Sequence, residues 1–185
     1  MGQQDTYLSN HFLIATPYLE DRRFAGTLTL ICEHTSEGAM GVVVNQPLGM
    51  SLGDILSQLT LPGKPVEAPV YGGGPVMKER GFVLHRPHGE WQNTLAVNDN
   101  LALTSSKDIL EAMARGEGPG DFLMLLGYSG WSAGQLEQEL AGNTWLTCQA
   151  SEQILFDCPP EDRLDSALKQ LGVNPSHLSG SVGHA

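Results

Sequence analysis

Two short apolar runs joined by a polar turn constrain the fold most strongly. Residues Thr27–His34 and Met40–Asn45 are rich in valine, isoleucine, leucine and threonine, and Ser36-Glu37-Gly38 separates them. This pattern predicts a β-hairpin, in which the two strands pair antiparallel. Similar runs predict further strands at His11–Thr16, Pro69–Gly73, Gly81–Arg86, Asn93–Val97, Phe122–Gly127, Trp145–Thr147 and Ile154–Phe156.

Four helical segments lie between and after these runs. Ser51 and Asp54 predict a capping box at the start of a helix whose apolar stripe is Leu52, Ile55, Leu56 and Leu59. The other helices are expected to begin near Ser105, Ser132 and Pro160. Because helices and strands do not alternate strictly, we expect an α+β fold with a mixed, mainly antiparallel sheet and flanking helices. No linker is apparent, so residues 1–185 are expected to form one domain, with 174–185 as a loosely held tail.

Charge and composition restrict the function. The chain has 10 lysines and arginines against 21 acidic residues, a net charge of −11, which disfavours direct contact with nucleic acid or an anionic membrane surface. No apolar run approaches the ~20 residues that span a bilayer. The three cysteines show no C-x-x-C spacing, which fits a reducing compartment, and we expect a cytoplasmic protein. No motif indicates a metal or a cofactor.

One segment matches a catalytic motif. Gly130-Trp131-Ser132-Ala133-Gly134 has the G-x-S-x-G form of a nucleophile elbow, which needs small residues around a serine on a strained turn. Acids and histidines follow it in the order of such hydrolases, at Asp157, Asp162, His177 and His184. The alternative is a helix cap in which Ser132 and Gln135 bond to each other's backbone. We interpret the segment as a cap and assign no catalytic residue, with a small hydrolase using Ser132 as the alternative.

Polar and aromatic residues at strand ends are candidates for a binding pocket. We expect Asn45, His85, Tyr128 and Trp131 to converge on one concave surface. The alternative is that the glycines serve close packing and that Trp131 fills the edge of a core. The Gly72-Gly73-Gly74-Pro75 segment is expected to be a tight turn rather than a phosphate loop, because no helix follows it directly. The full candidate set is His34, Asn45, Gln46, Gly73, Gly74, His85, Tyr128 and Trp131.

Seven ordered motifs, from about residue 7 to the C-terminus, resemble the AlgH/YqgE family of bacterial proteins. They are His11–Ala15, Gly38–Pro47, Tyr71–Val76, Arg80–His85, Leu126–Trp131, Gly134–Glu137 and Ile154–Asp157. The resemblance implies an α+β fold whose bifurcated sheet curls into a pseudo-barrel, and a cytosolic location. Some members carry the label of transcriptional regulator, and no catalytic residue is established for the family. It also implies that the position of Ser132 varies and that position 46, here the neutral Gln46, is commonly basic.

These observations favour a non-catalytic cytosolic protein that binds a small molecule or a protein partner and has an indirect regulatory role. A regulator that contacts DNA directly is disfavoured by the net charge of −11. The sequence leaves the ligand, the partner and the oligomeric state open.

Overall fold

A computed structural model describes residues 7–16, 24–64 and 67–173. Residues 174–185, where the sequence predicts a tail, lie outside this part, and so do His177 and His184. The chain divides into two compact units. Unit 1 contains residues 1–45 and 130–185, and unit 2 contains residues 46–129. One long strand, β9 (Asp121–Ser132), begins in unit 2 and ends in unit 1.

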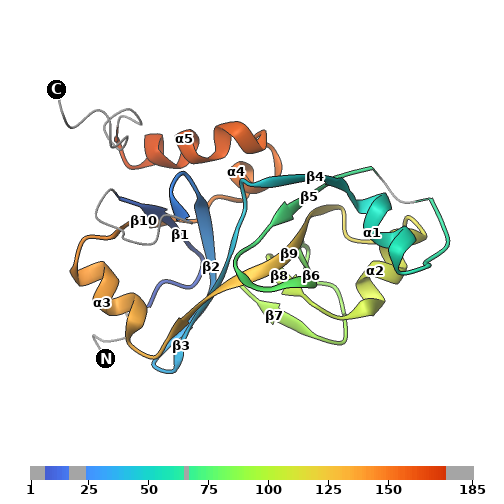
Figure 1. The fold of residues 1–185 in the computed structure, drawn as a ribbon, viewed down its shortest axis with the longest axis horizontal. Coiled ribbons are helices and arrows are strands. Elements are labelled where there is room, and N and C mark those ends of the chain that lie inside the picture. Colours follow the sequence, from blue (N-terminus) through green and yellow to red (C-terminus); the bar gives the residue numbers. More distant parts are fainter. Residues whose placement is uncertain (1–6, 17–23, 65–66, 174–185) are drawn as a thin grey trace. The chain divides into compact units, whose positions relative to one another are not determined.

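The sheet of unit 1 confirms the predicted hairpin. Strands β2 (Leu28–Thr35) and β3 (Gly38–Val43) pair antiparallel. Strand β1 (His11–Ala15) pairs antiparallel with β2 on one edge and with β10 (Trp145–Gln149) on the other. The order β10-β1-β2-β3 therefore brings an early and a late segment of the chain, β1 and β10, side by side in one sheet (Figure 1). The tip of the hairpin requires Gly38, because a Cβ atom there would lie 2.5 Å from the carbonyl oxygen of Trp131.

Three helices belong to unit 1. Helix α3 (Gln135–Ala141) follows β9, and α4 (Glu152–Phe156) and α5 (Pro160–Gln170) follow β10. Pro160 occupies the first turn of α5, where its missing N–H costs nothing. The core-facing side of α5 includes Arg163, whose side chain is 4% exposed. Its guanidinium donates to the carbonyl oxygens of Val44 (2.6 Å) and Cys158 (3.0 Å), which ties the helix to the chain after β3.

Unit 2 is arranged around β9. Strand β5 (Pro69–Gly72) pairs parallel with one edge of β9, and β6 (Val76–Arg86) pairs antiparallel with the other. Strand β4 (Pro47–Ser51) pairs with β5. On the other side, β8 (Ala102–Thr104) pairs with β6, and β7 (Thr94–Ala96) pairs with β8. All these pairs except β5–β9 are antiparallel. The observed fold confirms the α+β class with a mixed, mainly antiparallel sheet.

Helices α1 (Leu52–Gln58) and α2 (Lys107–Ala114) lie side by side at one end of unit 2 (Figure 1). The predicted capping box of α1 is present: the backbone N–H of Asp54 donates to the Ser51 hydroxyl, and that of Ser51 donates to the Asp54 carboxylate. Both helices bury apolar residues against β5, β6 and β9. The shared core consists of Leu52, Ile55, Leu56, Val70, Val83, Ile109, Met113, Ala114 and Met124.

Three expectations are wrong, and two strands were missed. Ile154–Phe156 is part of α4 rather than a strand, because the Ser151 hydroxyl caps the backbone N–H of Ile154. The strand predicted at Phe122–Gly127 is longer, since β9 continues to Ser132, where a helix was expected to begin. Strands β4 and β8 were not expected, since Pro47 and the brevity of β8 hide the alternation that identifies a strand. Leu59 is not in the core: it ends α1 and is 41% exposed.

Candidate functional site

In unit 1, three of the predicted site residues have structural partners. His34 is 3% exposed; its Nδ1 accepts from the backbone N–H of Leu8 (3.0 Å), and its Nε2 lies 3.3 Å from a Glu137 carboxylate oxygen. The side chain of Asn45 accepts from the backbone N–H of Leu28 (2.9 Å) and donates to the Gly26 carbonyl oxygen (3.1 Å). Both side chains therefore join segments of the backbone.

Trp131 is also a core residue of unit 1, where it is 6% exposed. Its ring packs edge-on against Trp145, with 6.1 Å between centroids, and Phe24 contacts both indoles. The indole N–H of each tryptophan donates to the same oxygen, Oε1 of Glu139, at 3.0 Å from Trp131 and 2.8 Å from Trp145. The Trp131 ring thus offers no open face to a ligand.

In unit 2, His85 is fully buried. Its Nδ1 lies 3.0 Å from the Pro87 carbonyl oxygen, which can only accept, so Nδ1 carries the proton. Nε2 then accepts from the Thr104 hydroxyl (2.8 Å), which in turn lies 2.9 Å from the Thr94 hydroxyl. Burial lowers the pKa of His85 from its usual 6.5. The ring is a neutral link between β6, β8 and β7.

The predicted glycines serve a close crossing of backbone. A Cβ atom on Gly73 would lie 2.3 Å from the Gly127 carbonyl oxygen, and one on Gly74 would lie 2.3 Å from the Tyr128 carbonyl oxygen. The segment after β5 thus passes directly over β9. Tyr128 itself is half-buried, and its ring meets Phe82 edge-on at 5.7 Å.

Gln46, the remaining candidate, is exposed, and its carbonyl oxygen accepts from the backbone N–H of Gly72 (2.9 Å). Of the four side chains expected to converge, Asn45 and Trp131 belong to unit 1, whereas His85 and Tyr128 belong to unit 2. Convergence of all four on one surface stays a prediction.

Ser132 does not occupy a strained elbow. It is the last residue of β9, and helix α3 begins three residues later, after Gly134 with φ of 78°. Oε1 of Gln135 accepts from the backbone N–H of Ser132 (2.9 Å) and from its hydroxyl (3.3 Å). One half of the predicted cap is present, since Gln135 reaches back to Ser132. The other half is absent: Gly134, not Ser132, is the residue that caps α3.

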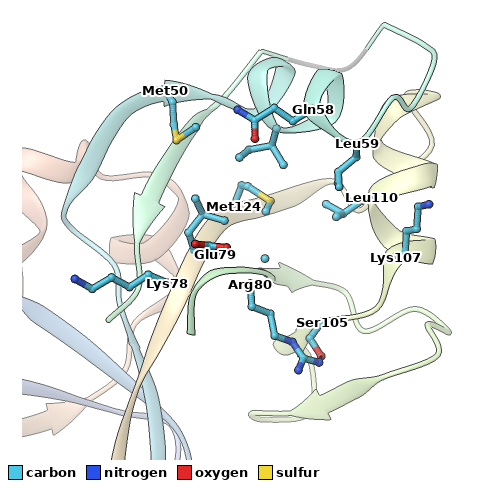
Figure 2. Close-up of a pocket in the computed structure, with 13 residues that line it drawn as sticks. Met50, Gln58, Leu59, Lys78, Glu79, Arg80, Ser105, Lys107, Leu110 and Met124 are labelled. Atoms are coloured by element: carbon cyan, nitrogen blue, oxygen red, sulfur yellow. The ribbon is translucent and has the colours of Figure 1, made fainter. Parts of the chain in front are cut away.

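The site that the structure does provide is a cavity of about 550 Å³ within unit 2. Figure 2 shows its residues on β4, β6, β9, α1 and α2, which border it. One side is apolar, and we call it the cavity wall: Met50, Ile55, Leu59, Leu110, Met124 and Leu126. Three basic residues line the edge of the cavity, and we call them the cationic mouth: Lys78, Arg80 and Lys107. Glu79, Gln58, Ser105 and Gly81 complete the lining.

The sequence did not identify these residues as a site. Most residues of the cavity wall have helix or strand periodicity that also describes a core, and they are separated by up to 76 positions, from Met50 to Leu126. The one available signal was charge: three of only 10 basic residues in an acidic chain lie at positions 78, 80 and 107. Their proximity in space depends on the register of β6 and on the position of α2.

Other chemistry has little support within the described residues. No group of three or more histidine, cysteine, aspartate or glutamate side chains there is arranged to hold a metal ion. Burial raises the pKa of the Cys32 thiol to about 12, so this thiol stays protonated and unreactive. Among the helices of the described residues, none is both long and apolar enough to cross a membrane.

Comparison with known proteins places the chain in a family. A family model described as DUF179, AlgH-like, matches residues 12–176. A UPF0301 protein of Hahella chejuensis is 50% identical over 185 residues, covering 100% of both chains. Another, of Nitrosospira multiformis, is 52% identical and covers 98% of this chain and 100% of its own.

Solved structures agree. The solution structure of AlgH from Pseudomonas aeruginosa is 49% identical, covers 95% of this chain and 94% of its own, and has a TM-score of 0.81. A crystal structure of a Corynebacterium diphtheriae protein shares the fold at 19% identity, with a TM-score of 0.69 over 88% of this chain and 86% of its own. The chain belongs to the AlgH-like family.

Proposed function

We propose that this chain is a non-catalytic binding protein that holds a small molecule in the cavity of unit 2. We further propose that it acts in the cytoplasm as one domain and affects regulation only indirectly. The cavity carries the proposal: its volume of about 550 Å³ falls within the usual ~300–1,000 Å³ of small-molecule sites. An apolar wall with a few polar groups at the opening is the usual composition of such sites.

The exposure of the cavity wall supports this function. Leu59 is 41% exposed although its helix buries Leu52 completely, and Leu110 and Leu126 are only partly buried. Burying an apolar side chain contributes about 1.5–3 kcal/mol. A ligand that covers these side chains would recover part of that free energy, and this gain favours binding.

A neutral apolar fluorophore tests this function. N-phenyl-1-naphthylamine should bind saturably to the native protein, and Leu110→Trp should abolish the binding by filling the cavity. The matched control is Leu61→Trp, because Leu61 packs on the same core and does not line the cavity. The absence of saturable binding, or equal loss in both variants, would contradict the proposal.

The hydrolase alternative has a separate test. In the observed geometry the Ser132 hydroxyl donates its proton to an amide oxygen, which is not a base. We therefore expect a fluorophosphonate probe to leave the native protein unlabelled. Labelling that disappears in Ser132→Ala would favour the hydrolase instead.

A further inference from the structure

Strand β6 contains a bulge beside the cavity. Val76 pairs with Tyr128, and Gly81 pairs with Leu126. Between these two pairs β6 advances by five residues and β9 by only two, so β6 has three extra residues. Residues 77–80 are all exposed, and Met77 has a φ of 48°, which is rare for a residue other than glycine. Bulges of this kind redirect side chains and often lie beside functional sites. Here the bulge brings Lys78, Glu79 and Arg80 into the lining of the cavity.

The charges at the opening are opposite in sign to those of the whole chain. The cationic mouth has three positive charges, and Glu79 is the one acidic residue that lines the cavity with them. The cavity lining therefore carries a local excess of two positive charges in a chain of net charge −11. A cleft surrounded by charges of one sign concentrates ligands of the other sign.

The positive groups surround the cavity and do not fill it. In Figure 2 the Lys78 and Lys107 ammonium groups point outward on opposite sides, and Arg80 extends toward Ser105. A guanidinium nitrogen of Arg80 donates to the Ser105 hydroxyl (3.2 Å), and the guanidinium carbon lies 5.6 Å from the centroid of the Phe82 ring. These contacts hold Arg80 in place, whereas the two lysine side chains are exposed and can turn toward a ligand.

From this arrangement we infer that the ligand is an amphipathic anion, with a carboxylate or phosphate head group and an apolar chain or ring. The inference rests on the proposed function. The apolar part occupies the cavity against the cavity wall, and the head group stays at the cationic mouth. Arginine is suited to both head groups because its planar guanidinium donates two parallel hydrogen bonds to them.

Three ligands of eight carbon atoms each test the inference by calorimetric titration. Octanoate and octyl phosphate carry the anionic head groups, and 1-octanol is the neutral reference. We expect both anions to bind more tightly than 1-octanol, and Lys78→Gln with Lys107→Gln to weaken only the anions, by about two- to fivefold for each lysine. Glu79→Gln should strengthen their binding, because it removes the one negative charge lining the cavity.

The matched control is Lys64→Gln with Lys169→Gln, which removes the same charge from exposed positions that do not line the cavity. It should leave all three affinities unchanged. If 1-octanol binds as tightly as the anions, or if the two double variants behave alike, the inference is wrong and the proposed function stands. If none of the three ligands binds, both are wrong. The relative affinity of octanoate and octyl phosphate distinguishes the two head groups.

Discussion

Glu139 is the residue on which the aromatic core of unit 1 depends most directly. Its Oε1 accepts from the indoles of Trp131 and Trp145, and its Oε2 accepts from the side-chain amide of Gln135 (3.0 Å). Both tryptophans are almost completely buried, at 6% and 5% exposed. Neither indole could turn to water if the carboxylate were removed.

We therefore expect Glu139→Ala to lower the free energy of unfolding by roughly 2–4 kcal/mol, because it leaves two buried donors unsatisfied. Urea unfolding followed by tryptophan fluorescence measures this change. Gln138→Ala is the control, since Gln138 is exposed on the same helix, and it should change stability by less than about 0.5 kcal/mol. Similar losses in the two variants would contradict the role of Glu139.

His85 predicts how stability depends on pH. Burial lowers the pKa of His85 below 6.5 in the folded protein. At pH values between the pKa of His85 in the folded protein and its pKa in the unfolded chain, the unfolded chain therefore binds a proton more readily than the folded protein does. The contribution of His85 to the free energy of unfolding is therefore fully present above about pH 6.5 and decreases as the pH falls. Denaturation at pH 7.5 and 5.5 should show a smaller decrease in the free energy of unfolding for His85→Gln than for the native chain. An identical decrease would show that His85 is not the titrating group.

At the scale of elements, the crossing of the β5–β6 connection over β9 explains two glycine-rich segments. Gly73 and Gly74 approach the backbone of Gly127 and Tyr128 so closely that no side chain fits, and the Ser129 hydroxyl donates to the Gly73 carbonyl oxygen (3.4 Å). The strand can therefore continue through Gly127 to Ser132 without a turn.

A single methyl group at the crossing tests this explanation. Gly73→Ala should lower the free energy of unfolding by roughly 2–4 kcal/mol, because its Cβ atom would overlap the Gly127 carbonyl oxygen. Gly120→Ala is the matched control, since no atom lies within 4 Å of its Cβ position and its φ is not positive. Thermal unfolding should separate the two variants clearly. Equal melting temperatures would show that the backbone at the crossing can move to accommodate the added methyl group.

Local signals predicted most elements, and their failures have physical causes. The hairpin tip at Gly38, the Ser51 capping box and the proline that begins α5 are each encoded within a few residues, so they could be read from the sequence. The segment at Ile154 was misread because three apolar residues fit a strand or a helix equally well, and the Ser151 cap decides between them. The continuation of β9 depends on Gly73 and Gly74, more than 50 positions away.

At the scale of the whole molecule, the sequence predicted the fold class and the family but not the cavity. A cavity is a gap between helices and strands that come from separate parts of the sequence, and no local sequence pattern predicts such a gap. Its residues come from five elements, β4, α1, β6, α2 and β9, and they include the bulge in β6, whose three extra residues follow from a register shift. The convergence of the residues first expected to form a pocket stays a prediction, and three of them have partners within their own unit. In His34, Asn45 and His85 the hydrogen-bonding groups contact other parts of the protein.

Methyl NMR spectra test the central claim most directly, because they report on the cavity wall and on the core of unit 1 in one experiment. The protein, labelled at methionine, isoleucine and leucine methyl groups, would be titrated with N-phenyl-1-naphthylamine, whose rings shift nearby resonances. We predict saturable shifts at Met50, Ile55 and Met124, with Leu13 and Ile31 in the core of unit 1 unchanged. Shifts largest in unit 1, or no saturable shift at the cavity wall, would contradict the assignment of the cavity as the binding site.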